Sequence, residues 1–376
     1  MRLPVSSGLN SFIAIGPDYA LHFCETRIMR QDKVRWAVLG AARIATTKVI
    51  PALQSGECSE VFAISSRDLV KAQRVARDLS IPKAFGSYEE ALADPDVEAV
   101  YIPLPNHLHV PWSIRAAEAG KHVLCEKPIA VSADECRKLI EVRDRTSVKI
   151  GEAFMVRTHP QWLRARELVR SGKIGSLRAV ICVFSYSNRD PANVRNIREF
   201  GGGAVMDIGC YPIQISRFLF AEEPVSVAGR LELDPQFQTD RLSSALLEFP
   251  SGHCLFTVST QSLFYQRVQI LGSRGRIEVE VPFNPSPDRE CRLLVDSCED
   301  LWGAGIRLEK LAACNQYTIQ GDAFSRAIRG DGDVPTPLED SLWNTAVIEA
   351  VFESAQTGLA VRPGVLEGDA KASVSL

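Results

Sequence analysis

The stretch from Val34 to Ala45, VRWAVLGAARIA, is the strongest indication of the fold. A short apolar run ends in a turn of small residues, and a helical pattern follows. A strand that enters a helix through such a turn leaves backbone N–H groups unpaired at the helix start, where a pyrophosphate can bind. The usual fingerprint is GxGxxG or GxGxxA, and the matching residues here are Gly40, Ala42 and Ala45. Because alanine replaces the middle glycine, an ordinary strand–turn–helix corner remains an alternative at this point.

Length and composition limit the class of protein. With 376 residues, the chain is long enough for two domains. Its 45% hydrophobic and 24% charged residues are typical of a globular protein, and a net charge of −3 provides no basic surface for nucleic acid. No apolar run approaches the roughly 20 residues that cross a bilayer, and the N-terminus lacks a secretory signal. We therefore expect a cytoplasmic protein with a small-molecule partner, and neither a nucleic-acid nor a membrane partner.

The cysteines and histidines do not indicate a metal centre. The 10 cysteines are scattered and contain no CxxC pair, so we expect reduced thiols that act as small apolar side chains. His107 and His109 lie two residues apart with no evident third ligand. We therefore expect no metal site.

The residues after the second expected strand, at 60–65, bear on cofactor choice. An NAD enzyme usually has Asp or Glu here, where the carboxylate binds the ribose 2′-hydroxyl. This chain has Ser65, Ser66 and Arg67 instead. Hydroxyl groups and a guanidinium would bind a 2′-phosphate that a carboxylate would repel. The pattern predicts NADP, unless Arg67 is simply a surface residue.

Two further strands end in loops with polar side chains. The strand at 99–102 leads into the loop 103–109, which we expect beside the cofactor because such sheets bind ligands at the carboxyl ends of their strands. The strand at 122–125 leads into Glu126, Lys127 and Pro128. These charges could be solvated in a turn. In the functional interpretation, partial desolvation lowers the pKa of the Lys127 ammonium, so that it can exchange a proton.

Several motifs occur together at informative spacings: GAARIA at 40–45, the loop 103–109, EKP at 126–128, GEAFMVRTHP at 151–160 and GGGAVMDIGCY at 201–211. With them the chain resembles the Gfo/Idh/MocA oxidoreductase family. It is most similar to the branch of NADP-dependent D-xylose or glucose 1-dehydrogenases, dimeric dihydrodiol dehydrogenases and glucose–fructose oxidoreductase. The sequence departs from the family pattern at Ala42 and in a short segment before Gly201.

The resemblance implies an α/β Rossmann domain with a doubly wound parallel sheet, followed by an α+β domain with a large open, mostly antiparallel sheet. We expect a flexible extension at 1–32, the NADP-binding domain at 33–153 and the substrate-binding and dimerisation domain at 154–376. An open sheet face would normally be buried against another subunit, which favours a homodimer. The second sheet is supported by strand patterns of the chain itself at 177–184, 225–233, 243–249, 252–261 and 266–272.

The resemblance also implies a set of site residues. Tyr211 would exchange the proton with the substrate oxygen, and Lys127 would lower the pKa of Tyr211, although either group could titrate. Asp207 would share a helix face with Tyr211 and reach the same substrate, or it could be an early-helix charge. Arg157 and His159 could contact sugar hydroxyls or support the site from outside. Cofactor contacts are expected at Gly40, Ala42, Arg43, Ile44, Ser65, Ser66, Arg67, Pro103, Leu104, Asn106, His109, Glu126 and Lys127.

The expected activity is NADP-dependent oxidation of the C1 hydroxyl of an aldopyranose, such as D-xylose or D-glucose, to the lactone. Oxidation of a trans-dihydrodiol would use the same proton-handling group and is the alternative. A non-catalytic NADP-binding sensor on the same fold would be expected to lack Lys127 or Tyr211, and the chain has both.

Overall fold

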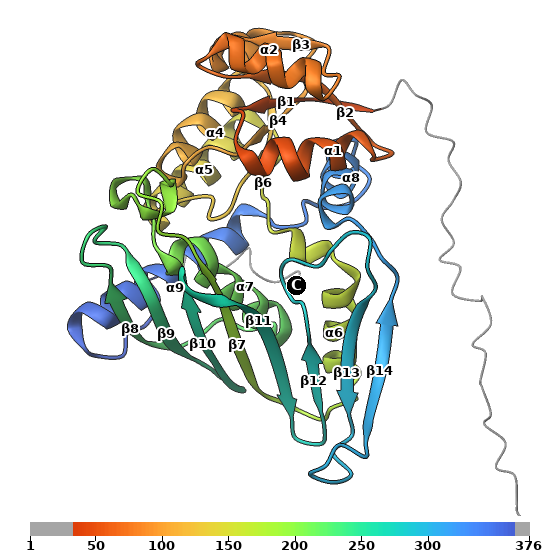
Figure 1. The fold of residues 1–376 in the computed structure, drawn as a ribbon, viewed down its shortest axis with the longest axis vertical. Helices are drawn as coiled ribbons and strands as arrows, with labels where there is room; N and C mark the ends of the chain where they lie inside the picture. Colours follow the sequence, from red (N-terminus) through yellow and green to blue (C-terminus); the bar gives the residue numbers. More distant parts are fainter. Residues whose placement is uncertain (1–32, 365–376) are drawn as a thin grey trace, which may run out of the picture. The chain divides into compact units, whose positions relative to one another are not determined.

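A computed structural model describes residues 33–364 (Figure 1). The predicted extension at 1–32 lies outside the described residues. The first half of the described chain contains β1 (Val34–Leu39), η2 (Ala45–Val49), α1 (Ile50–Gln54), β2 (Ser59–Ser65), α2 (Leu69–Asp78), β3 (Lys83–Phe85), α3 (Tyr88–Ala93), β4 (Ala99–Ile102), η3 (Asn106–Leu108), α4 (His109–Glu118), β5 (His122–Cys125), α5 (Ala133–Thr146), β6 (Ile150–Glu152), η4 (Met155–Thr158) and α6 (Pro160–Arg170).

The second half begins with the long strand β7 and ends with the longest helix. Its elements are β7 (Leu177–Ser187), η5 (Val194–Asn196), η6 (Arg198–Phe200), η7 (Val205–Gly209), α7 (Cys210–Phe220), β8 (Ser226–Leu233), β9 (Asp240–Phe249), β10 (Gly252–Ser259), β11 (Gln261–Gly272), β12 (Arg276–Val279), β13 (Cys291–Asp296), β14 (Ile306–Leu311), α8 (Gln316–Ile328) and α9 (Leu338–Thr357).

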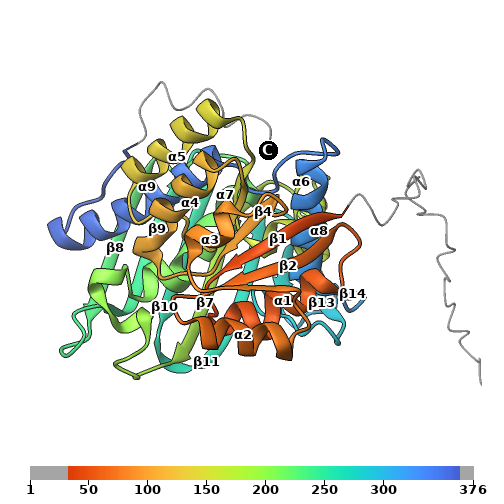
Figure 2. The same ribbon diagram turned by 90° about the horizontal axis from the view of Figure 1, so that it is seen from above.

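The first sheet is parallel and has the order β3-β2-β1-β4-β5-β6. Its central strands are buried on both faces, as their almost uniformly apolar sequences predict. Helices lie on both faces of this sheet (Figure 2). This strand order is that of a doubly wound dinucleotide-binding sheet, which confirms the predicted Rossmann architecture.

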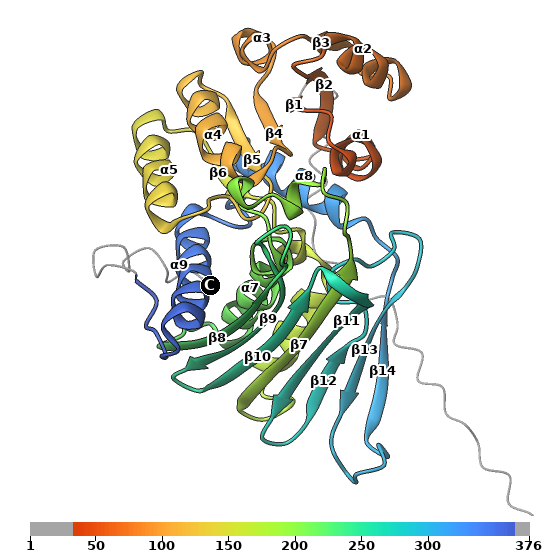
Figure 3. The ribbon, with the colours of Figure 1, turned by 60° about the vertical axis from the view of Figure 1, so that its left-hand side comes forward.

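The second sheet has eight strands in the order β14-β13-β12-β11-β7-β10-β9-β8. All neighbours are antiparallel except β7 and β10, which run parallel. Helices α6, α7 and α9 cover one face, and no helix of residues 33–364 lies on the other (Figure 3). The expected large open sheet is therefore confirmed.

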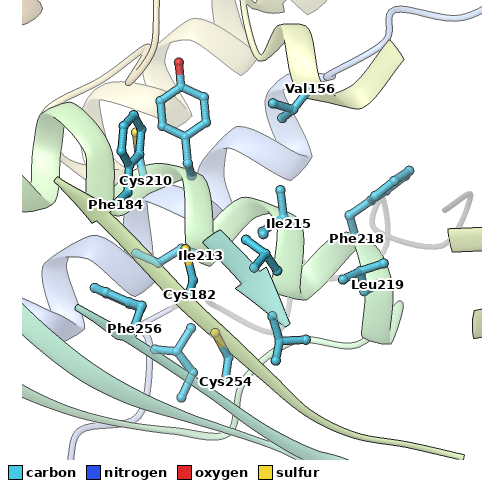
Figure 4. Close-up of a cluster of buried hydrophobic side chains, with 14 of the residues drawn as sticks. Val156, Cys182, Phe184, Cys210, Ile213, Ile215, Phe218, Leu219, Cys254 and Phe256 are labelled. Atoms are coloured by element: carbon cyan, nitrogen blue, oxygen red, sulfur yellow. The ribbon is translucent and has the colours of Figure 1, made fainter. Parts of the chain in front are cut away.

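Side chains from α7 fill the space beneath the second sheet. Ile213, Phe218 and Cys210 pack with Cys182 of β7 and Cys254 of β10 in one buried cluster (Figure 4). The cysteines in the described part of the chain are free, and most are buried. Burial raises the pKa of Cys254 to about 12. These thiols therefore serve as small apolar side chains, as expected.

The last two helices pack against both halves of the chain. Phe324 of α8 lies in the core beside α1, and Asp322 accepts hydrogen bonds from the backbone N–H groups of Glu57 and Cys58 at 3.0 and 2.9 Å. The start of α9, including Leu342, packs against the first sheet, whereas Val351 packs beneath the second. The two sheets are thus joined by a shared layer of helices. No helix in residues 33–364 combines the length and apolarity that a membrane span requires.

Candidate active site

A cavity of about 1080 Å³ lies where the carboxyl ends of the first sheet face one end of the second sheet. Three turns of the first sheet, after β1, β4 and β5, form one wall, which we call the cofactor wall because it contains the expected dinucleotide turn. The end of β7, the segment 188–202 and the start of α7 form the other, which we call the substrate wall because it contains Tyr211, the residue expected to face a substrate. The polar residues that line the cavity are Arg43, Thr47, Lys48, Asn106, His109, Glu126, Lys127, Tyr186, Asn188, Asp190, Asn193, Arg195, Asp207, Tyr211, Asn284 and Tyr317.

The turn after β1 brings the chain closely past the loop that follows β4. Gly40 has φ +112°, and a Cβ atom there would lie 2.9 Å from the Leu104 side chain. Only glycine fits this combination of positive φ and close approach. Ala42, Arg43 and Ile44 follow and line the cavity. The turn therefore presents the residues after Gly40 to the cavity, at the position where a dinucleotide-binding sheet holds a pyrophosphate, even though Ala42 replaces the usual glycine.

The three residues predicted to bind a 2′-phosphate differ in their burial and in their hydrogen-bond partners. The Ser65 hydroxyl donates to the Val38 carbonyl at 3.2 Å and is fully buried, so it stabilises the strand end rather than facing a ligand. Ser66 Oγ accepts from the Asp68 N–H at 3.2 Å. Arg67 is exposed, and its charge acts on the hydroxyl of Tyr88, which lies over Gly40. None of these residues lines the cavity.

The loop after β4 is fixed by His109. Its two ring nitrogens lie 2.8 Å from the Pro128 carbonyl and 2.7 Å from the Leu104 carbonyl. Burial lowers the pKa of His109 to about 4. The imidazole therefore connects the two loops that carry Leu104 and Lys127. Pro103, Leu104, Asn106 and His109 all line the cavity.

Glu126 forms the floor between these loops. Its carboxylate accepts from the Tyr101 hydroxyl at 2.6 Å and from the Lys127 backbone N–H at 3.3 Å. Burial raises the pKa of Glu126, while Lys127 and the Tyr101 hydroxyl partly offset that effect. Lys127 follows it directly, so the turn presents a carboxylate and an ammonium side by side.

Lys127 is anchored across the cavity to the other wall. Its Nζ donates to the backbone carbonyl of Asp207 at 2.6 Å and lies 3.2 Å from Asp207 Oδ1. Pro212, five residues after Asp207, has no N–H group and so cannot donate a π-helical hydrogen bond to the Asp207 carbonyl. Burial opposes the charge on Lys127, but Asp207 outweighs it and raises the Lys127 pKa. The expected lowering of this pKa is therefore wrong, because the sequence did not show that a carboxylate would face the ammonium.

Asp207 is held by three partners. Besides Lys127, its Oδ2 accepts from the Tyr186 hydroxyl at 2.5 Å and lies 2.9 Å from Arg195 Nε. Burial alone would raise the Asp207 pKa, but Arg195 and Lys127 lower it well below its usual range. Burial and the neighbouring carboxylate raise the pKa of Tyr186, which keeps its hydroxyl protonated as a donor. Asp207 is therefore an ionised anchor for this wall.

Tyr211 lies beneath the Lys127 ammonium, which is 5.0 Å from the centre of its ring. Its hydroxyl lies 3.6 Å from the sulfur of Met155. Burial raises the Tyr211 pKa well above its usual value, so the expected lowering is not found. Tyr211, Lys127 and Asp207 nevertheless line the same cavity, as the sequence motifs predicted.

The helix that carries Asp207 and Tyr211 begins as the π-helical turn η7 rather than as the expected regular helix. Asp240 holds its start: Oδ2 accepts from the Val205 N–H at 2.8 Å and from the Ser243 hydroxyl at 2.6 Å. A Cβ atom on Gly203, which has φ +117°, would lie 1.9 Å from Asp240 Oδ1. The third glycine of the GGG motif is therefore required by this cap.

Arg157 and His159 are not brought to the cavity. The Arg157 side chain is buried, its guanidinium lies 4.4 Å from the centre of the Phe218 ring, and its Nη1 lies 3.9 Å from Asp340. His159 caps α6, where Nδ1 accepts from the Gln161 N–H at 3.1 Å. Both positions favour the supporting role that the sequence left open for them.

The sequence interpretation missed two residues of the substrate wall, Tyr186 and Arg195. Tyr186 lies two residues beyond the expected strand 177–184, and Arg195 lies in the segment before Gly201 that departs from the family pattern. A strand end that faces the cofactor edge could have indicated Tyr186. Nothing local indicates Arg195, because its partner lies twelve residues later and across a glycine turn.

The fold and the cavity define an oxidoreductase with a dinucleotide-binding sheet and a second, open sheet on the other side of the cavity. Two family models match the chain: the NAD-binding Rossmann fold of the GFO/IDH/MocA oxidoreductase family over residues 34–154, and the GFO/IDH/MocA C-terminal domain over residues 162–278. The chain belongs to this family, which confirms the resemblance found in the sequence.

Named relatives cover most of the chain. An uncharacterised oxidoreductase of Rhizobium meliloti is 48% identical over 87% of this chain and 98% of its own length. A D-xylose 1-dehydrogenase (NADP(+)) of Haloferax volcanii is 38% identical over 87% of this chain and 98% of its own length. A trans-1,2-dihydrobenzene-1,2-diol dehydrogenase of Mus musculus is 34% identical over 67% of this chain and 76% of its own length.

A solved structure shows the same architecture with ligands. The 3-ketoreductase of Actinomadura kijaniata, in complex with NADP and TDP-benzene, superposes with a TM-score of 0.80 at 28% identity. The match covers 86% of this chain and 98% of that protein. The likeness to NADP-dependent relatives and to an NADP complex agrees with the predicted cofactor.

Proposed function

We propose that this chain is an NADP-dependent dehydrogenase that oxidises the C1 hydroxyl of an aldopyranose, such as D-xylose or D-glucose, to the lactone. The observation that carries the proposal is that Lys127 and Tyr211 converge on one cavity beside the dinucleotide turn, although eighty-four residues separate them. The relation to a D-xylose 1-dehydrogenase supports the substrate class.

The cavity fits the cofactor. The turn at Gly40 packs so closely on Leu104 that only glycine fits there, and Ala42, Arg43 and Ile44 after it line the same cavity as the loops that carry Leu104 and Glu126. Gly40, Ala42, Arg43 and Ile44 would hold the pyrophosphate end, and Arg67 with Ser66 would select the 2′-phosphate of NADP. When bound, the nicotinamide supplies the hydride chemistry.

The residues of the chain position the sugar and move one proton. As the C–H hydrogen of C1 leaves as hydride, the hydroxyl proton must pass to a base. We assign this exchange to Tyr211: its tyrosinate form accepts the substrate proton in the oxidation, and its neutral hydroxyl returns that proton in the reverse reduction. Because burial raises the Tyr211 pKa, the tyrosinate form, and with it the oxidation, should increase with pH. Lys127, held charged by Asp207, would donate a hydrogen bond to the same substrate oxygen and stabilise negative charge on it. The proton-handling groups lie in a largely buried site, where such charge stabilisation is stronger than in water.

A second candidate is oxidation of a trans-dihydrodiol to a catechol, which the relation to the mouse enzyme supports. A non-catalytic NADP sensor is the candidate from another class, but it would not require the Lys127–Asp207 pair. Purified protein with NADP or NAD, screened against aldoses and dihydrodiols by absorbance at 340 nm, separates the three. Turnover of aldoses supports the proposal, turnover of dihydrodiols alone replaces it, and cofactor binding without turnover favours the sensor.

We further propose a cytoplasmic homodimer formed through the open sheet face. Ile181, Leu246 and Leu255 lie side by side there in register and are 36%, 39% and 44% exposed. Exposed apolar groups of this kind are typical of interfaces. Light scattering should give twice the 41.4 kDa chain mass. Leu255→Lys should give monomers; a monomeric wild type would contradict this assembly.

A further inference from the structure

Arg195 occupies a rigid position at the mouth of the cavity. The Gly203 N–H donates to the Arg195 carbonyl at 2.9 Å. A Cβ atom on Gly202 would lie 2.5 Å from the same oxygen. Because both glycines pack against this carbonyl, the backbone of Arg195 is fixed relative to the helix that carries Asp207.

Only one side of the Arg195 guanidinium is paired with another residue in the part of the chain that the structure describes. Its Nε lies 2.9 Å from Asp207 Oδ2, and its side chain is 42% exposed. Within residues 33–364, its two Nη groups have no hydrogen-bond partner, and the side chain lines the cavity. A guanidinium has a fixed fork of donors, so an Nε bound to Asp207 directs the Nη groups to one defined place.

The oxygens of Asp207 are already engaged. Oδ1 faces Lys127, while Oδ2 accepts from the Tyr186 hydroxyl and faces Arg195. Asp207 is only 8% exposed. It therefore has little capacity for a substrate hydroxyl and acts mainly on the groups around it.

We propose that Arg195 is a positioning and substrate-contact residue: through Nε it holds Asp207 in the orientation that anchors Lys127, and its Nη groups bind a substrate oxygen. This inference rests on the proposed function. Tyr186 completes the arrangement as a neutral donor to the same carboxylate. The site then holds the charged Lys127 through a carboxylate that Arg195 and Tyr186 hold in turn from the opposite side.

The inference has an electrostatic consequence. Arg195 lowers the pKa values of Lys127 and Tyr186, besides lowering that of Asp207. The charged and titratable groups that face this cluster are Glu126, Lys127, Tyr186, Arg195, Asp207, Cys210, Tyr211 and Asp240. Removing a positive charge raises the pKa of every neighbouring group, whichever of them titrates during turnover.

The test compares Arg195→Met, Arg195→Lys and the matched control Arg198→Met, in which an exposed arginine of the same segment is removed. For Arg195→Met we expect kcat/KM for the oxidation to fall about 10- to 100-fold. The rise of kcat/KM with pH should move to higher pH by about one unit. Arg195→Lys should restore the pH profile, because the charge returns. The KM for the sugar should stay raised in Arg195→Lys, because lysine lacks the paired Nη donors of the guanidinium.

Two results would overturn the inference. One is a loss of kcat/KM in Arg195→Met that is the same at every pH, so that the pH profile is not shifted. The other is an equal loss of kcat/KM in Arg198→Met. NADPH affinity, measured by fluorescence, should be unchanged in all variants, which controls for folding. If the wild type oxidises no aldose or diol, the proposed function fails, and the anchoring role of Arg195 is tested without substrate. In ¹³C NMR, the Asp207 carboxyl, assigned with Asp207→Asn, should then titrate at higher pH in Arg195→Met than in wild type; unchanged titration would refute the anchoring role.

Discussion

The two walls of the cavity are built in different ways. In the cofactor wall, short turns after parallel strands place backbone groups and neighbouring side chains, as at Gly40 and Glu126. In the substrate wall, Asp207 meets partners from three other segments, at Lys127, Tyr186 and Arg195. The first wall is therefore local in sequence, whereas the second exists only when distant segments pack together.

A pair of buried carboxyl groups shows the same difference. Asp207 faces two cations, and its pKa is lowered. Glu152 of β6 accepts from the Ile129 N–H at 2.9 Å and faces no such pair, and burial raises its pKa to about 7. Burial alone therefore favours a neutral carboxyl, and a carboxylate in the cavity depends on the cations around it. Substitutions in each wall test this contrast.

The substrate wall should carry the largest effect on turnover. Tyr211→Phe removes the hydroxyl assigned to the proton exchange and should lower kcat about 10²- to 10⁴-fold, as is usual for general acid–base groups. NADPH binding should persist. Tyr265→Phe, which changes a surface tyrosine of β11, is the control and should keep full turnover. Near-normal turnover in Tyr211→Phe would transfer the proton exchange to Lys127.

Gly203→Ala tests how strongly the substrate wall depends on close packing. The new Cβ would collide with Asp240 at a positive φ, so we expect a loss of about 3 kcal/mol or more in the free energy of unfolding. Gly330→Ala is the control, because Gly330 has φ +83° and nothing within 4 Å of an added Cβ. It should cost only about 1–2 kcal/mol. Equal losses in urea titrations would show that Asp240 moves away freely.

Glu152→Gln tests the buried carboxyl of the cofactor half. Because the folded protein binds this proton more tightly than the unfolded chain, its stabilisation is full below about pH 4 and is lost as the pH rises through 7. The stability of Glu152→Gln relative to wild type should therefore improve by up to about 3 kcal/mol between pH 4.5 and pH 8. Glu141→Gln, on the exposed face of α5, should show no such trend. Parallel pH curves for wild type and Glu152→Gln would mean that Glu152 is ionised throughout.

The smallest effect is expected at the rim of the cofactor wall. Arg67→Ala should lower kcat/KM with NADP about 10- to 100-fold and leave that with NAD unchanged, because only NADP has a 2′-phosphate for the guanidinium. Lys71→Ala removes a nearby exposed charge of α2 as a control. Equal losses with both cofactors, or a wild-type preference for NAD, would contradict the role of Arg67.

Much of the fold follows from local sequence patterns. The strands at 99–102 and 122–125 were predicted with the bounds that the structure has, because buried parallel strands are short apolar runs that end in turns. The π-helical start at Val205 was not predictable, since it depends on the cap from Asp240, thirty-five residues away. The burial of the Ser65 hydroxyl was also missed, because the Val38 carbonyl to which it donates lies on the neighbouring strand.

Contiguous motifs were enough to predict the dinucleotide turn, the two kinds of sheet and the placing of Lys127, Asp207 and Tyr211 on one cavity, because the local geometry of each motif is nearly fixed. The charge state of the site and the positions of Tyr186 and Arg195 beside Asp207 follow only from the packing of distant segments. A pKa depends on every charge within a few ångströms, and those charges come from segments that sequence spacing does not relate. The same reason explains why the pKa of Lys127 is raised where the sequence alone predicted that it would be lowered.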